Sequence, residues 1–79
     1  MTIDQMWERL AAHQPYADQR GYGEAWAQMC AERTPEAAEA AAAAAWAVLA
    51  TQAWWAAWAA ARGATDEATG WIEKAEGRE

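Results

Sequence analysis

The chain has 79 residues, among them 25 alanines and seven tryptophans, and its twelve acidic and six basic side chains give a net charge of −6 at pH 7. This length excludes a multidomain chain, because a compact domain typically needs about 100 residues, and a content of only five Val, Ile and Leu residues argues against a β-sheet. The acidic excess argues against direct binding to nucleic acid, because that binding depends on Lys and Arg displacing counterions from the phosphates.

The first predicted helix spans residues 3–13. Thr2 and Gln5 have the spacing of a capping box, in which each side chain bonds the backbone N–H of the other residue. Apolar residues then recur at helical spacing and leave the charged positions on the other side; they are Ile3, Met6, Trp7 and Leu10. We therefore expect an amphipathic helix whose apolar stripe faces the core.

A connection over residues 14–23, which has room for a short turn inside it, and a second helix over residues 23–33 follow. Pro15 disfavours helix at the residue before it, and a Gly-Tyr-Gly run closes the segment with glycines that allow a sharp turn. From there apolar side chains again repeat every three or four positions, at Trp26, Met29 and Cys30. This pattern predicts a second short helix.

A long helix over residues 35–62 is the central prediction. Thr34 has the side chain of an N-cap, Pro35 suits the first helical position, and no glycine or proline follows until Gly63. At 1.5 Å per residue these 28 residues would extend about 42 Å, whereas a domain of this size is about 30 Å across. The helix therefore either bends near residues 50–52 or overhangs the domain and contacts another molecule.

A last helix over residues 66–76 completes the fold. Thr65 is predicted to cap it, and its apolar stripe consists of Ala68, Trp71, Ile72 and Ala75. The predicted fold class is therefore all-α. One helical domain covers residues 1–79, and in it three short helices surround one long Ala/Trp-rich helix.

Residues 40–61 contain no charged side chain over 22 positions, a length that could cross a bilayer. Most of them are weakly hydrophobic alanines, Thr51 and Gln52 lie at the centre, and the tryptophans lie inside the run rather than at its ends, where membrane indoles usually lie. A helix buried in a bundle explains this composition better. No basic residue precedes an apolar stretch at the N-terminus, so no signal peptide is predicted, and the single cysteine, Cys30, fits a reducing cytoplasm.

The tryptophans of the long helix supply the candidate binding site. At 100° per residue, the large apolar side chains of residues 46–58 point in nearly all directions around the helix axis. Three short helices cannot bury all of them, and tryptophan is strongly enriched among the residues that dominate binding energy. The predicted protein-interface residues are Trp54, Trp55 and Trp58, with Glu36, Glu39, Asp66 and Glu67 as charges at the rim. Each single tryptophan could instead belong to the core.

Catalytic and metal chemistry finds little support in this sequence. His13 is the only histidine, so a site with two imidazoles cannot form. Cys30 lies on an apolar stripe, where a free cysteine usually acts as a small hydrophobic side chain rather than as a nucleophile. Glu73 and Glu76 share a helix face but have no further ligands beside them, so we interpret them as solvated surface charge. We therefore predict no enzyme, no cofactor and no metal site.

In size, acidity and lack of catalytic groups, the chain resembles the small single-domain proteins with which phages and mobile elements block host defence complexes, including anti-CRISPR proteins. The resemblance is one of type and carries over no residues. It implies a stoichiometric inhibitor, and the acidic charge suits a protein partner with a basic surface. The alternative is a self-associating structural or accessory subunit, in which two copies form a homodimer through the overhanging long helix.

Overall fold

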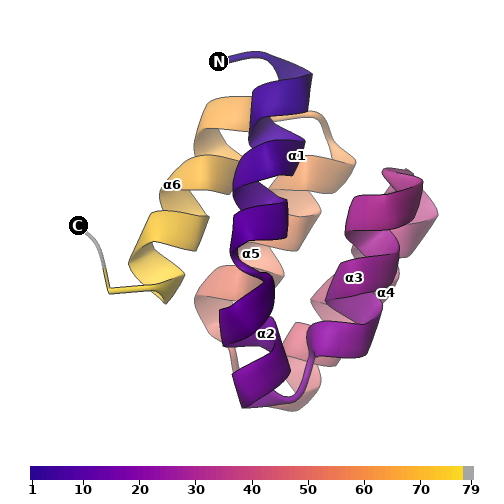
Figure 1. Cartoon of the computed structure of the whole chain (residues 1–79), viewed down its shortest axis with the longest axis vertical. Coiled ribbons are helices and arrows are strands. Elements are labelled where there is room, and N and C mark those ends of the chain that lie inside the picture. Colours follow the sequence, from indigo (N-terminus) through magenta and orange to yellow (C-terminus); the bar gives the residue numbers. More distant parts are fainter. Residues whose placement is uncertain (78–79) are drawn as a thin grey trace.

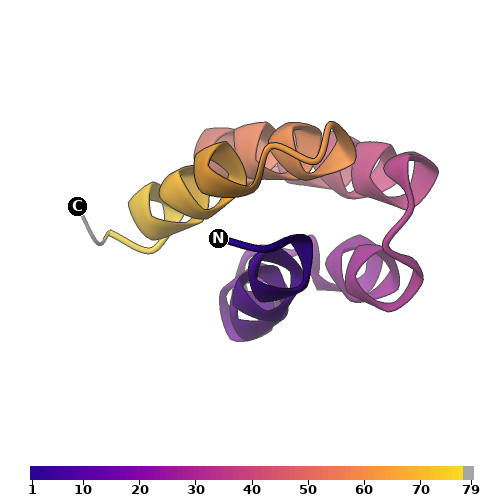
Figure 2. The same ribbon diagram turned by 90° about the horizontal axis from the view of Figure 1, so that it is seen from above.

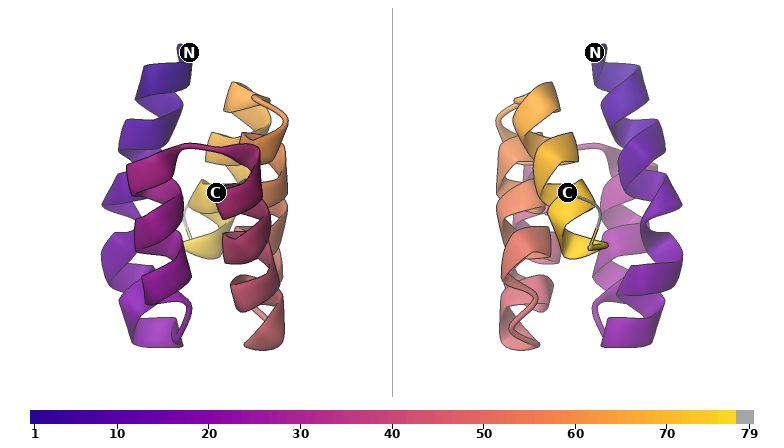
Figure 3. Two further views of the ribbon diagram at one scale, coloured as in Figure 1. Left: turned by 90° about the vertical axis from the view of Figure 1, so that its right-hand side faces the viewer. Right: turned by 90° about the vertical axis from the view of Figure 1, so that its left-hand side faces the viewer.

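The computed structural model describes residues 1–77, and this part of the chain is all-helical and compact, with extents of 28 × 28 × 17 Å (Figure 1). Its helices are α1 (Ile3–Ala12), α2 (Gln14–Arg20), α3 (Gly23–Glu32), α4 (Pro35–Ala47), α5 (Thr51–Ala61) and α6 (Thr65–Ala75). They form two layers (Figures 2 and 3). In one layer α4, α5 and α6 lie side by side as antiparallel neighbours, and α1, α2 and α3 make up the other.

The first residues of the helices confirm two of the predicted N-caps. Thr2 and Gln5 bond each other's backbone N–H groups in a capping box, which confirms the start of α1, and the Thr34 side chain caps α4, also as predicted. The predicted connection over residues 14–23 is wrong, because α2 lies there. Pro15 falls in the first turn of α2, where a backbone N–H would have no partner within the helix. The proline therefore starts a helix instead of preventing one.

The predicted long helix over residues 35–62 is also wrong, because it is broken into α4 and α5. Leu49 takes a left-handed conformation, with φ of 60°. Its N–H donates to the carbonyl of Trp46 at 2.9 Å. The N–H of Ala50 donates to the carbonyl of Ala45, also at 2.9 Å, which completes the Schellman pattern that ends a helix. The turn folds α5 back along α4, so no helix overhangs the bundle and the basis for a homodimer through a long helix is lost.

The turn between α5 and α6 repeats the turn between α4 and α5. Gly63 has φ of 72°, and its N–H and that of the next residue close the same two hydrogen bonds, at 3.0 and 2.9 Å. An Ala-Thr pair follows in both turns, at residues 50–51 and 64–65, fourteen positions apart. Leu49 therefore stands where glycine stands in the second turn. A side chain in this left-handed conformation costs about 1 kcal/mol or more.

Thr65 does not cap α6 as predicted. It is the first helical residue, the N-cap position belongs to Ala64, and the Thr65 hydroxyl donates to the carbonyl of Met1 at 3.4 Å. The turn that precedes α6 sets the direction of the backbone, so the helix starts without a side-chain cap. It begins one residue before the predicted span of 66–76.

The core pairs small side chains from one layer with large ones from the other. The buried alanines of α4 and α5 are Ala37, Ala38, Ala41, Ala42, Ala45, Ala53, Ala56, Ala57, Ala59 and Ala60. The largest fully buried side chains are Trp26, Tyr22, Met6, Leu10, Met29, Ile72 and His13. Trp26 also donates its ring N–H to the carbonyl of Leu10 at 2.8 Å. Alanine thus makes room for indole and methionine side chains, which replace the aliphatic core that this chain lacks.

Within residues 1–77, no helix is both long enough and apolar enough to cross a membrane. The uncharged run over residues 40–61 is divided between α4, with 13 residues, and α5, with 11.

Candidate functional site

A row of four indoles crosses the outer surface of the layer formed by α4, α5 and α6. The ring centroid of Trp46 lies 4.9 Å from that of Trp54, which lies 4.5 Å from that of Trp55. Trp55 in turn stacks on Trp71 of α6 with a centroid distance of 5.9 Å. These separations are typical of favourable aromatic pairs. The four side chains, called the indole row below, therefore form one continuous aromatic strip across three helices.

The indoles lie outside because alanines occupy the inside of the layer. Every buried position of α5 is an alanine, so Trp54, Trp55 and Trp58 fall on the opposite arc of the helix. Trp55 is 39% exposed and Trp46 is 52% exposed, whereas Trp54, Trp58 and Trp71 are partly buried. The structure thus brings the three predicted interface tryptophans to one surface, and Trp55 is the most open of the three.

Two members of the row lie outside the predicted interface. Trp46 is not among the interface residues predicted from the sequence, and Trp71 is predicted to lie on the apolar stripe of the last helix. In the structure Ala68 and Ile72 are the fully buried residues of that stripe, whereas Trp71 is partly buried. Its ring stacks on that of Trp55, and the ammonium of Lys74 lies 4.7 Å from its centroid. Placing residues 46–58 around the axis of one unbroken helix also gives Trp46 a wrong position, because it belongs to α4 and the other three tryptophans belong to α5. The repeated Ala-Thr pair was the sequence signal that could have revealed the break.

The four predicted rim acids gather at one end of the same layer. Glu36 and Glu39 lie near the start of α4, and Asp66 and Glu67 near the start of α6. Both helix starts lie at the same end because α5 runs antiparallel to its two neighbours (Figure 1). All four side chains are exposed, and Glu67 accepts a hydrogen bond from Arg62 at 2.7 Å. They form an acidic end beside the indole row rather than a rim around it.

A buried polar network joins α1, the end of α6 and the start of α3. The carboxylate of Glu76 accepts two hydrogen bonds from Arg9, at 2.6 and 3.2 Å, and one from Nδ1 of His13 at 2.7 Å. Nε2 of His13 lies 2.6 Å from the hydroxyl of Tyr22. The side chains of His13 and Glu76 are only 0% and 1% exposed. A neutral imidazole that carries its proton on Nδ1 and accepts from Tyr22 satisfies every group in this network.

The prediction of Glu76 as a solvated surface charge is therefore wrong, because its side chain is only 1% exposed. Its partners Arg9 and His13 lie 67 and 63 positions away in the chain, so no local pattern reveals the burial. His13 has both ring nitrogens bonded and is closed to solvent. The network holds the end of α6 to the other layer.

Burial and hydrogen bonding shift the titration of these groups. Burial lowers the pKa of His13 because it disfavours the imidazolium, and the hydrogen bond with Glu76 offsets only part of this effect. Burial alone would raise the pKa of Glu76, but hydrogen bonds from Arg9 and His13 outweigh it and hold that pKa below its ordinary value. Burial raises the pKa of the Cys30 thiol to about 11, so the thiol stays protonated at neutral pH. In this neutral form it acts as a small hydrophobic side chain.

These pKa shifts predict that the protein loses stability in acid. A folded-state pKa below the unfolded value means that the unfolded chain binds more protons, so stability falls as pH decreases. The loss should begin below the ordinary pKa of His13, 6.5, and continue below that of Glu76, 4.5. Urea denaturation followed by circular dichroism from pH 8 to pH 4 measures it. His13→Gln should remove the part of the loss that begins below pH 6.5, and a parent protein that loses no stability below that pH would contradict the prediction.

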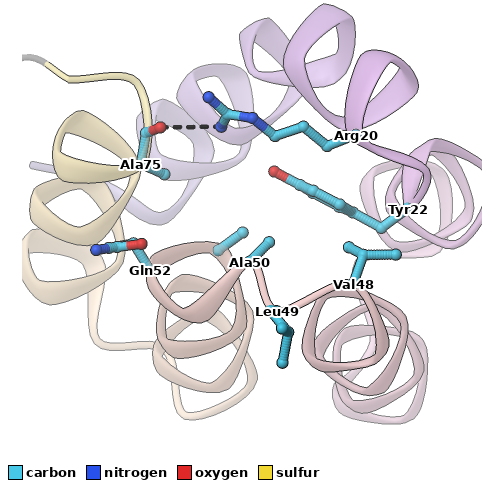
Figure 4. Close-up of a pocket in the computed structure, with 8 residues that line it drawn as sticks. Arg20, Tyr22, Val48, Leu49, Ala50, Gln52 and Ala75 are labelled. Carbon is cyan, nitrogen blue, oxygen red and sulfur yellow. Dashed lines mark hydrogen bonds between the residues drawn. The ribbon is translucent and has the colours of Figure 1, made fainter.

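A cavity of about 360 Å³ lies between the end of α2, the turn between α4 and α5, and the end of α6 (Figure 4). Arg20 closes one side by donating to the carbonyl of Ala75 at 2.9 Å. The other lining residues are Tyr22, Val48, Leu49, Ala50, Gln52 and Ala53. The side chain of Leu49 points away from the other lining groups in this view. The cavity thus combines aliphatic side chains with a guanidinium, a phenol and an amide, and most of its exposed lining surface is polar.

No group of three or more His, Cys, Asp or Glu side chains within residues 1–77 is arranged to hold a metal ion. Comparison of the chain with protein-family models, with curated proteins and with solved structures finds no match.

Proposed function

We propose that this chain is a non-enzymatic protein-binding module and that the indole row is its contact surface. The observation that carries the proposal is the exposure of Trp46 and Trp55 within a continuous aromatic strip, on a layer whose buried residues are mostly alanines. Burying an indole removes about 150–250 Å² of surface and supplies much of the energy of a small core. This chain has few large apolar residues, yet it leaves two indoles exposed. Their burial would therefore contribute binding free energy in a complex instead of folding free energy.

The charge distribution supports a partner with a basic surface. The acidic end of Glu36, Glu39, Asp66 and Glu67 lies on the same layer as the indole row, and the chain as a whole carries a net charge of −6. Opposite charges across an interface increase the association rate and exclude partners of the wrong sign. The indoles would then supply most of the affinity, and the acidic end would supply steering and orientation.

A stoichiometric inhibitor is the form of binding that we propose. A small rigid module that carries an aromatic strip and an acidic end can cover a basic functional surface of a larger complex without performing chemistry. The resemblance in size and acidity to phage and mobile-element inhibitors, anti-CRISPR proteins among them, supports this form. A cytoplasmic setting is part of the proposal, because the single protonated thiol of Cys30 needs no disulfide partner.

The test begins with affinity purification of the tagged chain from its source cells and mass spectrometry of co-eluting proteins. The purified partner is then titrated with the parent chain and with a Trp46→Ala, Trp55→Ala double variant. We expect a complex of fixed stoichiometry for the parent and at least about a hundredfold weaker binding for the double variant, since removal of a hot-spot side chain costs 2 kcal/mol or more. Glu36→Lys with Glu39→Lys should mainly slow association and reduce its salt dependence.

The matched control is Ile3→Ala, which removes another exposed apolar side chain, on α1 in the other layer. It should bind as the parent does. Equal affinity of the parent and the double indole variant, with both folded by circular dichroism, would reject the indole row as the contact surface. A partner whose bound surface is acidic would reject the proposed role of the acidic end.

A further inference from the structure

One ring of the indole row already holds a cation that the chain itself supplies. The ammonium of Lys74 lies 4.7 Å from the ring centroid of Trp71, within the distance of about 6 Å at which a cation is attracted to the face of an aromatic ring. Trp46 and Trp55 are 52% and 39% exposed, and no cation of residues 1–77 lies over either ring. These two indoles are therefore the ones at which a cation of another molecule can be held in the same way.

The acidic end lies where it attracts a cation to these two indoles. Trp46 lies seven positions after Glu39 on α4, and α5 continues for six positions beyond Trp55 before it reaches the acidic end (Figure 1). At 1.5 Å per residue, both separations along the helices are about 10 Å. The Debye length at physiological salt is about 8 Å, so the carboxylates act on a cation at the row mainly through their field. No charged side chain lies nearer on these two helices, because residues 40–61 have none.

Arginine is the side chain that combines a positive charge with a fit to an exposed indole. Its guanidinium is planar and more weakly hydrated than an ammonium, so it stacks on an aromatic ring at a smaller cost in hydration. Its aliphatic stem also covers apolar surface. The ring separations that join Trp46 to Trp54 and Trp54 to Trp55, 4.9 and 4.5 Å, make that surface continuous. The row thus suits both parts of an arginine side chain.

We propose that the indole row binds arginine side chains of the partner, whose guanidinium groups lie over the rings of Trp46 and Trp55 as the ammonium of Lys74 lies over that of Trp71. The inference rests on the proposed function, because it names the groups through which the basic surface of the partner contacts the row. The indoles then supply both the attraction for charge and the apolar area. One surface accounts in this way for the affinity and for the choice of a basic partner.

Three short peptides of one length test the proposal. They share the same glycine spacers and carry arginine, lysine or citrulline at the other positions, so that lysine keeps the charge without the planar group and citrulline keeps the shape without the charge. NMR titration of the backbone and indole N–H signals of the full chain measures binding. We expect saturable shifts at Trp46 and Trp55 with the arginine peptide. The citrulline peptide should bind at least about fivefold more weakly and the lysine peptide about twofold more weakly, since one exposed cation–π contact changes affinity roughly two- to fivefold.

A variant with Trp46→Leu and Trp55→Leu keeps the net charge of −6 and an apolar surface but removes the two open rings. It should bind the arginine peptide at least about fivefold more weakly than the parent does, and it should not distinguish arginine from lysine. Trp46→Phe with Trp55→Phe should fall between the two, because a phenyl ring attracts cations less than an indole does. Ile3→Ala, on the other layer, is the control and should bind as the parent does. Circular dichroism verifies that each variant is folded.

Equal affinity of the parent for the arginine and citrulline peptides would overturn the proposal, and so would equal affinity for the arginine and lysine peptides. Undiminished binding of the arginine peptide by the leucine variant would also overturn it. The partner titration with the Trp46→Ala, Trp55→Ala variant decides the proposed function separately. A partner that binds this alanine variant weakly but the leucine variant as tightly as the parent would leave the proposed function standing and reject the arginine contact.

Discussion

Replacement of Glu76 by alanine is expected to lower the free energy of unfolding by about 3 kcal/mol. The change removes the carboxylate that accepts three hydrogen bonds from Arg9 and His13, and it leaves their donors at a site that is closed to water on the imidazole side. Breaking a buried ion pair by removing one partner typically costs 3–5 kcal/mol. We expect the lower end of this range because the Arg9 side chain, 22% exposed, keeps some contact with solvent.

Urea denaturation at pH 7, followed by far-ultraviolet circular dichroism, measures this loss. Glu73→Ala is the matched control, because it removes the same side chain from an exposed position on the same helix and should change stability by less than about 0.5 kcal/mol. Glu76→Gln should fall between the two, since it keeps the shape but weakens both charge-assisted contacts. The structural role assigned to the network fails if Glu76→Ala is no less stable than Glu73→Ala.

Trp26→Ala should have an effect of similar or larger size. The indole is fully buried beside the rings of His13 and Tyr22, and its N–H donates to the carbonyl of Leu10. Truncation of a buried tryptophan costs about 3–5 kcal/mol, through lost transfer energy and the cavity left behind. Small domains have a stability of about 5 kcal/mol or little more, so much of this variant should be unfolded at 37 °C.

The same substitution at an exposed tryptophan tests whether the stability loss comes from the burial of the side chain. Trp46→Ala removes the same atoms from a side chain that is 52% exposed, and we expect it to cost less than about 1 kcal/mol. Thermal melts and urea denaturation of the two variants under one set of conditions make the comparison. Similar losses for both would mean that Trp46 is as important to the fold as Trp26, which would contradict its assignment to a binding surface.

The sequence predicted the features that depend on neighbouring residues. The Thr2 and Gln5 capping box and the Thr34 cap are readable because cap and helix are adjacent in the chain. The break after α4 could not be predicted, because no glycine or proline marks it. Leu49 takes the left-handed conformation that glycine normally adopts. Pro15 misled for a related reason, since the same residue type both ends helices and begins them.

The candidate site was predictable only in part, for physical reasons. Trp55 was identified because a ring of large side chains around one helix cannot be buried by so small a chain. Periodicity could not show which indoles face outward, because alanine and tryptophan are both apolar. Their positions depend on size, since the small alanine side chains fit the inner face of the layer and the large indoles lie on the outer face. The burial of Glu76 depends on Arg9 and His13, which come from the opposite end of the chain and are brought to it only by the packed fold.

The close spacing of the indole row gives the molecule a built-in optical reporter. Chromophores whose rings lie 4.5 to 5.9 Å apart couple their electronic transitions, so the ultraviolet dichroism of this protein should contain a contribution from the indole pairs of the α4–α5–α6 layer. Trp26 and Trp7 are buried in the other layer, so their fluorescence should report on the interior. Spectra of the unlabelled chain can thus distinguish an event on the outer surface from one in the interior.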